Sequence, residues 1–524
     1  MPSGSQLLLV VSTGVLFIIK KVLAYLRAVS AIRNHPGPCT LLAAKGKVAF
    51  FLPAIPGISV GHDCHFAQKH DVFQYYKWDV CSYISLWPSV KTSLFLADAA
   101  AIKEVTSSRA RFPKPTGEPY KSLRIFGPNI LISEGEEWKR HRKIVAPAFS
   151  DRNYKMVWDE TVRIANGFFD TVWGDREVVV VDHCVSDFTL PIALSIISAA
   201  GFGKRLEWKD DLTPIPQGHK MSFKESLEIV SSKFINRAAL ADWWLNLTGD
   251  GRRIQLAYDE LAVYMSEMIK GRLSMGKREH SDLFSNLLAS SFSEEFETTA
   301  LTEAELIGNT FIFLLAGHET TAHTLCFTFA LLALYPDEQE ILFQHIKSVL
   351  SDGRTPEHKD MPLLTHSMAV FYETLRLYPV ATFIAKHSAE DTTLNASNIR
   401  GEQTTIPVPK GTELHISIPG VHYNPRYWED PHAFKPSRFL NPDWPRDAFI
   451  PFSVGPRACI GRKFFETESI ALLTMLVAKY KITVKEEPQF ASETFEQRKG
   501  RVLKSREVLT LRPIRVPLTF SRRH

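Results

Sequence analysis

The sequence predicts a mainly α-helical protein with a smaller β-rich part. A long run from Glu303 to Leu334 is apolar nearly all round, which is typical of a helix buried in a large core. Residues 154–285 contain several amphipathic patterns of helical period, and another helix is expected to begin after Gly461. Period-two alternation is rarer, and it predicts strands at Val80–Trp87 and Lys91–Leu96 and a hairpin over Thr405–Ile418 that turns at Pro409-Lys410-Gly411.

The composition is that of an ordinary globular protein, with 45% hydrophobic and 23% charged residues. A net charge of +5 is small for 524 residues, so nucleic acid is not an expected partner. The cysteines lack paired spacing, which argues against a disulfide framework and favours reduced thiols in a body that faces the cytosol. They are Cys39, Cys64, Cys81, Cys184, Cys326 and Cys459.

The N-terminus departs from this pattern. Leu7–Ile19 is uncharged and mostly apolar, and Lys20 and Lys21 follow it. A helix that continues through Leu26, with the two lysines snorkelling to the headgroups, would anchor residues 1–35 in a membrane. A cleaved signal peptide is the alternative, but the positive charge follows the run and no small-x-small cleavage site comes after it. Positive flanks stay cytoplasmic, and the turn at residues 35–38 separates the anchor from a single domain over residues 36–524.

Three segments of the middle of the chain have simple interpretations. His62-Asp63-Cys64-His65 fits no common zinc pattern and is expected to be a surface loop. Asp98–Val105 is predicted to be a short helix, and Trp243-Trp244 to lie in the core or at a membrane surface. The glycosylation acceptors at Asn246 and Asn395 are discounted, because a cytosolic body would not meet the transferase.

The segment Glu136–Lys143 is predicted to be a helix that is acidic at its start and basic at its end. Trp138 and Arg142 are four residues apart and therefore share a face. An indole N–H and a guanidinium on one face suit a carboxylate such as a haem propionate, although a cation–π stack is an equally good interpretation.

The long helix should begin with a capping box formed by Thr302 and Glu305, and it should end at Tyr335-Pro336. Its centre carries Ala316-Gly317-His318-Glu319-Thr320-Thr321, and polar groups in a buried helix are costly unless they are used. Threonines in mid-helix can bond back to a carbonyl, and such a gap would leave space for a diatomic ligand. A polar patch satisfied between helices is the alternative.

Two further motifs lie nearer the C-terminus. Glu373 and Arg376 can pair on one face of an apolar helix, and Arg438 could complete a lock of three charges. In the loop Phe452–Gly461, Cys459 has glycines on both sides and Arg457 two residues before it. A thiolate at a helix N-terminus is stabilised by the peptide dipoles and could be an axial haem ligand. An inert buried cysteine is the alternative, which the surrounding pattern disfavours.

From Pro36 to the C-terminus these motifs together resemble those of a cytochrome P450. The resemblance implies one mostly helical, prism-shaped domain with a small β-rich lobe, which holds haem b between the long helix and the cysteine loop. It makes Cys459 the axial thiolate and places Glu319 and Thr320 as an acid–alcohol pair beside dioxygen. It gives Glu373, Arg376 and Arg438 as a structural triad. The further residues that it implies at the cofactor are Trp138, Arg142, Arg457, Lys386, Phe452 and Gly461.

Two positions depart from the family pattern. Lys386 stands where many members have a propionate-binding arginine, and a lysine offers a point charge rather than a fork. Ser437 replaces a glutamate that many members carry.

The implied activity is insertion of one oxygen atom from O2 into an apolar small molecule. Electrons would come from NADPH through a separate reductase, because no flavin- or nicotinamide-binding stretch is evident. The reductase would dock on a basic face made of Lys139, Arg140, Lys143, Arg462 and Lys463. The substrate pocket would draw on residues 119–132, 310–320, 380–384 and 505–508.

The resemblance to fungal microsomal members implies the endoplasmic reticulum membrane and secondary metabolism, with a terpenoid as the preferred substrate. Three alternatives stay open. They are a reductase-independent haem-thiolate isomerase or dehydratase, a fatty-acid or xenobiotic hydroxylase, and a haem sensor without enzymatic activity.

Overall fold

A computed structural model describes residues 4–43, 52–117, 120–206, 215–234, 237, 242–274, 284–285, 287–288 and 300–524. The chain folds into two compact units, and each is described by itself. The sheet unit consists of Met1–Pro115, Ala381–Ala433 and Pro445–Ala458. The helical unit consists of Thr116–Val380, Phe434–Trp444 and Cys459–His524.

The sheet unit is built on a five-stranded sheet in the order β1-β4-β5-β10-β7. β4 (Val80–Trp87) and β5 (Lys91–Leu96) have the predicted bounds and pair antiparallel. β1 (Cys39–Leu42) runs parallel to β4, and β10 (Glu413–Ser417) lies parallel to β5 and antiparallel to β7 (Phe383–His387). Besides α1 and short 3-10 turns, the other described elements of the unit are β2 (Ala54–Ile55), β3 (Ser59–Val60), α2 (Cys64–Gln68), α3 (Asp71–Tyr76), α4 (Ala99–Ser107), β8 (Thr392–Ser397), β9 (Gln403–Val408) and α16 (Ile418–His422).

Two predictions for this unit are wrong. The segment 405–418 is not a hairpin, because β9 pairs with β8 in a separate two-stranded sheet while β10 joins the five-stranded sheet. The segment 62–65 is not a surface loop, because Cys64 and His65 begin α2 and are buried. The His65 ring stacks on Phe95, with 4.9 Å between the ring centroids.

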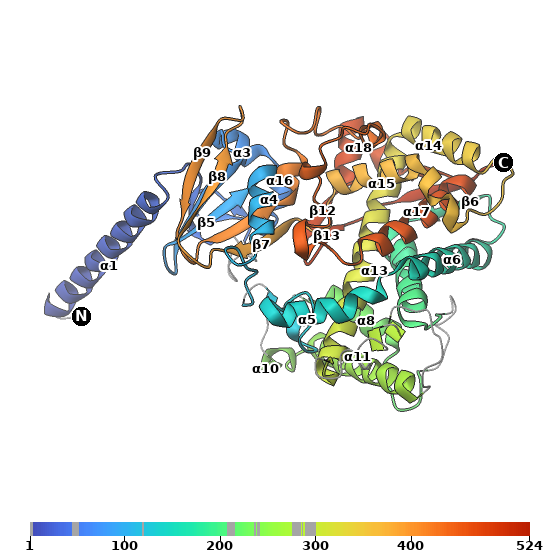
Figure 1. Cartoon of the computed structure of the whole chain (residues 1–524), viewed down its shortest axis with the longest axis horizontal. Coiled ribbons are helices and arrows are strands. Elements are labelled where there is room, and N and C mark those ends of the chain that lie inside the picture. The colour runs from blue at the N-terminus through green and yellow to red at the C-terminus, as the bar shows by residue number, and fades with distance from the viewer. Residues whose placement is uncertain are drawn as a thin grey trace. The chain divides into compact units, whose positions relative to one another are not determined.

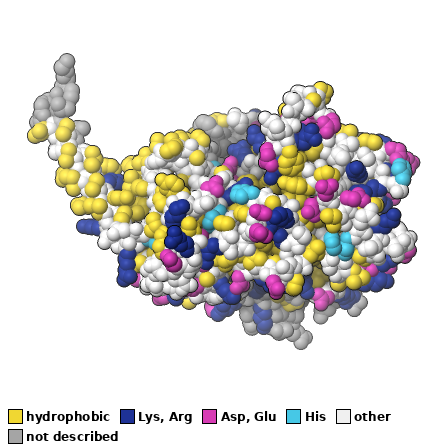
Figure 2. All heavy atoms as spheres, turned by 90° about the horizontal axis from the view of Figure 1, so that it is seen from above, with side chains coloured by type: hydrophobic (Ala, Val, Ile, Leu, Met, Phe, Trp, Pro, Cys, Tyr) yellow, Lys and Arg dark blue, Asp and Glu magenta, His cyan; other side chains and the backbone are white. Residues whose placement is uncertain are grey.

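The N-terminal helix α1 (Gly4–Ala31) extends away from the strands of the sheet unit (Figure 1). Near its base, Lys21 Nζ donates to the carbonyl oxygens of Leu86 and Pro88 at 2.9 and 2.5 Å. Many of its apolar side chains are exposed, including Phe17 and Ile18, and Figure 2 shows hydrophobic side chains along the projecting helix. Among the described residues, no helix combines the length and the apolar content that a bilayer crossing requires.

The helical unit is organised around α13 (Glu303–Leu334), which has the predicted bounds. The predicted capping box is present: the Glu305 N–H donates to Thr302 Oγ1 at 3.3 Å, and the Thr302 N–H donates to Glu305 Oε2 at 2.8 Å. The helix is buried along most of its length and packs against several others, among them α7. Its contacts with α11 and α15 can be followed in Figure 1.

The described helices of this unit are α5 (Gly135–Val145), α6 (Asp151–Phe168), α7 (Leu190–Ile196), α8 (Phe223–Ser232), α10 (Asp242–Leu245), α11 (Gly249–Ser274), α13, α14 (Pro336–Val349), α15 (Thr365–Leu377), α17 (Arg462–Lys479) and α18 (Phe495–Val502). Its strands are β6 (Val178–Val181), β11 (Tyr480–Val484), β12 (Ser505–Glu507), β13 (Leu511–Pro513) and β14 (Leu518–Arg522). β14 lies between β11 and β6, while β12 pairs with β13. The side chain of Trp244 and all of Pro119 lie outside the described part of the chain.

Candidate active site

Cys459 lies between a 3-10 turn (Gly455–Arg457) and the N-terminus of α17. The turn begins with Gly455 at a φ of +73°, a conformation that glycine adopts without strain. Cys459 is a free, solvent-accessible cysteine, and its thiol accepts a hydrogen bond from the Gly461 N–H. A Cβ at Gly461 would stand 4.0 Å from the sulfur and 3.8 Å from Phe149 Cε1. The sulfur is therefore held at a helix N-terminus, as the sequence predicts.

The electrostatics of this thiol differ from the expectation. The surrounding protein buries Cys459 deeply enough to raise the pKa of its thiol, even though solvent reaches the residue. The Gly461 N–H and the positive charges of Arg142 and Arg462 lower this pKa but do not outweigh the burial. The protein alone therefore favours the thiol, whereas a metal that binds sulfur favours the thiolate.

Arg142 provides a positive charge directed at Cys459. It lies on α5, is half-buried, and interacts electrostatically with the cysteine. Within the described ranges, its guanidinium makes no hydrogen bond or ion pair. A half-buried guanidinium without an anionic partner is costly, which makes Arg142 suited to an acidic ligand. Trp138, one turn earlier on α5, is 6% exposed.

The helix α13 is continuous, but its burial is broken near the centre, where the sequence predicts a gap. Ala316 is exposed and Gly317 and Thr320 are half-buried in a helix that is otherwise buried. The Thr320 hydroxyl donates to the Ala316 carbonyl at 2.7 Å, which is the predicted back-bonding. Gly317 is required by close packing, because a Cβ there would stand 2.9 Å from Ile197 Cδ1.

Glu319 is a buried acid in this segment. Its side chain is almost fully enclosed, and its Oε2 has no hydrogen-bond partner among the described residues. Burial raises the pKa of Glu319 to about 7, and the positive charge of Arg512 only partly opposes the shift. Glu319 is thus a carboxyl group that exchanges a proton near neutral pH, as a general acid requires.

Sequence analysis missed the partner of Thr321. Its Oγ1 lies 2.8 Å from the Gly317 carbonyl and 2.5 Å from Oε1 of Glu468, a buried residue of α17. A hydroxyl has one hydrogen, so if it donates to the carbonyl, the carboxyl must donate to the hydroxyl. Burial raises the pKa of Glu468 well above its usual range, which agrees with a protonated acid. An acid within the apolar pattern of 464–477 was the signal that could have revealed it.

The three predicted charges of the triad lie together in the helical unit. Glu373 accepts two hydrogen bonds from Arg376, from Nε at 2.7 Å and from Nη2 at 2.8 Å. Arg438 Nε donates to Glu373 Oε1 at 3.4 Å, and the Lys435 N–H donates to the same oxygen at 3.0 Å. Glu373 and Arg376 are fully buried, so α15 is fixed to the segment that follows residue 433 by a dry ion cluster.

Three other predicted site residues belong to the sheet unit. Lys386 lies on β7, where it is 4% exposed and pairs with Leu414 of β10. Arg457 ends the 3-10 turn before Cys459, and Phe452 precedes that turn. Their part in holding a cofactor stays a prediction.

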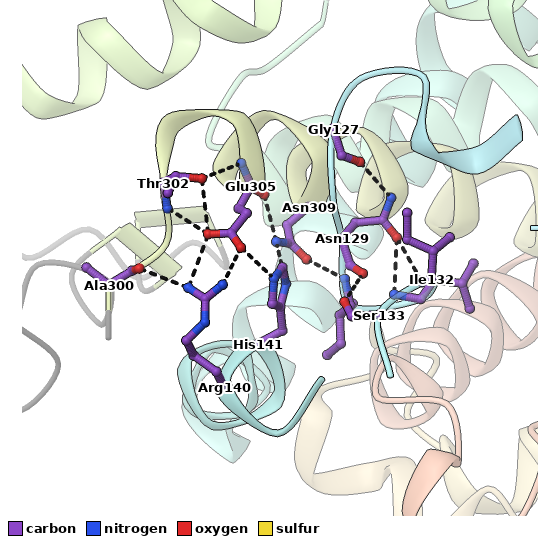
Figure 3. Close-up of polar contacts among 12 residues, drawn as sticks. Gly127, Asn129, Ile132, Ser133, Arg140, His141, Ala300, Thr302, Glu305 and Asn309 are labelled. Carbon is purple, nitrogen blue, oxygen red and sulfur yellow. Dashed lines mark hydrogen bonds and ion pairs between the residues drawn. The ribbon is translucent and has the colours of Figure 1, made fainter. Parts of the chain in front are cut away.

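The structure removes Arg140 from the predicted docking face. Its guanidinium turns inward and forms an ion pair with Glu305, which is 8% exposed (Figure 3). Two other members of the set stay on the surface in ion pairs, Lys139 with Glu136 at 2.6 Å and Lys463 with Asp151 at 3.5 Å.

Two predicted pocket residues meet in the helical unit. The ring centroids of Phe126 and Phe311 are 4.5 Å apart, and Phe126 also stacks on Tyr258 at 5.6 Å. Phe383, predicted to line the same pocket, belongs to the sheet unit and stacks on His65 at 4.9 Å.

Comparison with known proteins decides the family. The family model described as "Cytochrome P450" matches residues 53–509. The chain belongs to the cytochrome P450 family. It is 50% identical over 522 residues, 99% of this chain and 100% of the relative, to "Cytochrome P450 monooxygenase 124" of Postia placenta.

More distant relatives agree with this assignment. "Cytochrome P450 monooxygenase ORF6" of Penicillium roqueforti is 31% identical over 75% of this chain and 74% of its own length. "Cyclooctat-9-en-7-ol 5-monooxygenase" of Streptomyces melanosporofaciens is 28% identical over 69% of this chain and 74% of its own length. The protein is therefore a cytochrome P450 monooxygenase, which uses haem, O2 and electrons from a redox partner.

The residues of the helical unit fit the haem that this family binds. Three features match a thiolate ligand, a propionate contact and a surface against the ring: a solvent-accessible thiol, a guanidinium without an anionic partner in the described ranges, and an exposed alanine on a buried helix. The Oε2 of the buried Glu319, which has no hydrogen-bond partner among the same residues, can bind a water molecule.

Proposed function

We propose that this cytochrome P450 oxidises a C–H bond of an apolar small molecule, with Cys459 as the axial iron ligand. The accessible sulfur at the N-terminus of α17 carries the proposal. The guanidinium of Arg142, which has no ion-pair partner among the described residues, interacts electrostatically with this sulfur. Trp138, Arg142, Arg457 and Lys386 would hold the propionates, with Phe452 and Gly461 beside the ring. When bound, the haem supplies the binding and activation of dioxygen.

Glu319 and Thr320 would supply the protons for this chemistry. Because its pKa is about 7, Glu319 holds a proton on its carboxyl at neutral pH and can also release it. The Thr320 hydroxyl has its hydrogen on the Ala316 carbonyl, so its oxygen lone pairs are available to accept from water. The Glu319 carboxyl would donate its proton to a water whose hydrogen bond the Thr320 Oγ1 accepts. That water would release a proton of its own in turn, and Glu319 would regain a proton from solvent.

The substrate is proposed to be an apolar skeleton of secondary metabolism, with a terpenoid preferred. Phe126, Phe311 and Val380 contribute apolar side chains to the predicted pocket segments. The name of the Streptomyces relative, a monooxygenase of cyclooctat-9-en-7-ol, supports the preference for a largely hydrocarbon substrate.

The electrons are proposed to come from NADPH through a separate reductase. Lys139, Lys143, Arg462 and Lys463 would form the docking face, now without Arg140. Complementary charge at such a face speeds the encounter of two proteins.

Membrane attachment at the endoplasmic reticulum is proposed for α1. Burying its exposed apolar side chains in a lipid interface is favourable, and the exposed Lys20 suits the headgroup level. Lys21, also expected there, is held instead by the carbonyls of Leu86 and Pro88. The residues 1–35 would then act as an anchor and residues 36–524 as the monooxygenase domain.

One experiment separates this function from its rivals. The purified protein is mixed with an NADPH-dependent P450 reductase, and NADPH oxidation is measured against a panel of terpenes, polyketides and fatty acids. We expect a terpene to stimulate NADPH oxidation and to yield one oxygenated product per NADPH. Turnover of an organic peroxide without reductase would indicate an isomerase or dehydratase, and a fatty acid as best substrate would move the proposal to that class. Absence of substrate-stimulated oxidation would indicate a sensor.

A further inference from the structure

A buried chain of hydrogen bonds joins α5, the start of α13 and the loop before α5 (Figure 3). At its centre the imidazole of His141, which is fully buried, contacts two residues of α13. Its Nε2 lies 3.2 Å from Glu305 Oε1, and its Nδ1 lies 3.1 Å from Asn309 Nδ2. His141 directly precedes Arg142 in α5, so contacts that hold this imidazole also hold the backbone from which the Arg142 side chain projects.

The orientation of the Asn309 amide follows from its other partners. Its Oδ1 accepts from the Ile130 N–H at 3.0 Å, and its Nδ2 donates to the Glu305 carbonyl at 2.7 Å. A backbone N–H requires an acceptor and a carbonyl requires a donor, so this amide cannot be reversed. Nδ2 must therefore donate to His141 Nδ1, which leaves the imidazole hydrogen on Nε2, where it donates to Glu305.

The same pattern decides against a metal site. Carboxylate and imidazole atoms of Glu137, His141 and Glu305 lie within 4.8 Å of one another, which is close enough to surround a cation. However, both ring nitrogens of His141 are used, and the Glu305 carboxylate also accepts from Arg140 and Thr302. A cation would have to displace a guanidinium and reverse an amide that two backbone groups hold.

On the other side of Asn309, the network holds the loop that leads into α5. Asn129 is fully buried, its Nδ2 donates to the Leu123 carbonyl at 2.9 Å, and Oδ1 accepts from the Ile132 N–H at 3.2 Å. Backbones touch here without side chains between them: a Cβ at Gly308 would stand 2.2 Å from the Pro128 carbonyl oxygen. The loop and α5 are thus fastened to the same turns of α13.

We propose that His141, as the neutral Nε2–H tautomer between Asn309 and Glu305, is a positioning residue that sets Arg142 beside Cys459 and so governs how firmly the haem is held. The consequence for haem rests on the proposed function of Cys459 and Arg142. The link between α5 and α13 does not, because it consists only of side chains of the protein.

The link should fail in acid. Protonation of His141 Nδ1 would make it a donor that faces the Asn309 Nδ2 donor, so the hydrogen bond between these two atoms would break. The charged groups that face the imidazole are Glu305 of α13 and Glu137 and Arg140 of α5. Burial lowers the pKa of His141, and Glu305 offsets this only in part. The link is therefore intact above the unfolded pKa of about 6.5 and is lost as the pH falls through the lowered value.

The test compares His141→Leu with His183→Leu, a matched change at an exposed histidine of the helical unit. Amide hydrogen exchange of residues 138–145 in the holoprotein is expected to accelerate by about tenfold or more in His141→Leu and to stay unchanged in His183→Leu. Haem transfer to excess apomyoglobin should also accelerate by about tenfold, whereas added Mn²⁺ or Zn²⁺ should change neither rate in the wild type.

A second variant keeps the test decisive if His141→Leu folds poorly. In Asn309→Asp the Glu305 carbonyl loses its donor at every pH, but a carboxylate now faces Nδ1 and the imidazolium becomes the bonded form. Haem loss should therefore no longer accelerate in acid as it does in the wild type. Equal acid sensitivity in the two proteins, unchanged exchange in His141→Leu, or protection of residues 138–145 by a metal ion would overturn the proposal. If the wild type lacks a thiolate-haem spectrum but His141→Leu still frees α5, the proposed function fails and the link stands.

Discussion

Replacing Glu373 by glutamine removes the negative charge from the dry ion cluster of α15. The carboxylate accepts both contacts of Arg376, the Arg438 contact and the Lys435 N–H. Arg376 is fully buried, so its guanidinium would keep its charge in the interior after losing the Glu373 carboxylate. Arg438, at 12% exposure, can reach water more readily.

Breaking a buried ion pair on one side typically costs ~3–5 kcal/mol, because an uncompensated charge stays behind. We expect Glu373→Gln to lose about that much unfolding free energy. Arg438→Gln removes one long hydrogen bond at the edge of the cluster and should lose ~1–2 kcal/mol of unfolding free energy. The control is Lys155→Gln, which breaks an exposed pair with Asp159 whose side chains are 69% and 55% exposed and which should change stability by under ~0.5 kcal/mol.

The assay is urea denaturation followed by circular dichroism, with haem content measured on the same samples. The double variant Glu373→Leu/Arg376→Met leaves no buried charge between these two positions, so it should be more stable than Glu373→Gln alone. The reasoning is refuted if Glu373→Gln costs no more than Lys155→Gln, or if the double variant loses the sum of its two single changes.

Three further predictions concern the polar centre of α13. Because the pKa of Glu319 is about 7 in the native state and about 4.5 when unfolded, the native state binds more protons between these values. The unfolding free energy of the protein should fall by up to ~3 kcal/mol as the pH rises through this range. Denaturation measured at successive pH values should show no such pH dependence in Glu319→Gln. Thr320→Ala should keep its haem but consume NADPH with less product and more hydrogen peroxide. The unfolding free energy of Glu468→Gln should lie within ~1 kcal/mol of the wild-type value, because an amide N–H can still donate to Thr321. Glu468→Leu should lose ~1–3 kcal/mol of unfolding free energy.

Each of these has a contrary result. A full pH slope in Glu319→Gln would place the raised pKa elsewhere, and unchanged coupling of NADPH to product in Thr320→Ala would remove that hydroxyl from proton delivery. Equal losses of stability in Glu468→Gln and Glu468→Leu would mean that the hydrogen bond between this side chain and Thr321 does not stabilise the fold.

The sequence predicted correctly those helices and strands whose ends are determined by neighbouring residues. The bounds of β4, β5 and α13 follow from alternation, a capping box and a stopping Tyr335-Pro336, and all three have the expected ends. The hairpin prediction for 405–418 was wrong because a turn motif does not determine which strands pair with the two segments beside it. β9 and β10 each find partners elsewhere in the chain.

Side-chain roles were predicted less well where the partner is distant in sequence. Arg140 looked like a surface cation of α5, but Glu305 lies 165 residues away and draws it inward. The Thr321–Glu468 contact spans 147 residues, and its only local signature is that Glu468 is an acid in an otherwise largely apolar stretch. The hydrogen bond between His141 and Asn309 was not predicted for the same reason, because this buried polar network forms only when three segments of the chain come together.

The most direct test of the account is the absorption spectrum of the dithionite-reduced protein with carbon monoxide, for the wild type and for Cys459→Ser. The account predicts a strongly red-shifted Soret band in the wild type and its loss in the variant, because Cys459 would supply the thiolate to the haem and a serine hydroxyl cannot. A wild type with the band of a histidine-ligated haem, or a Cys459→Ser protein that keeps the red-shifted band, would contradict it.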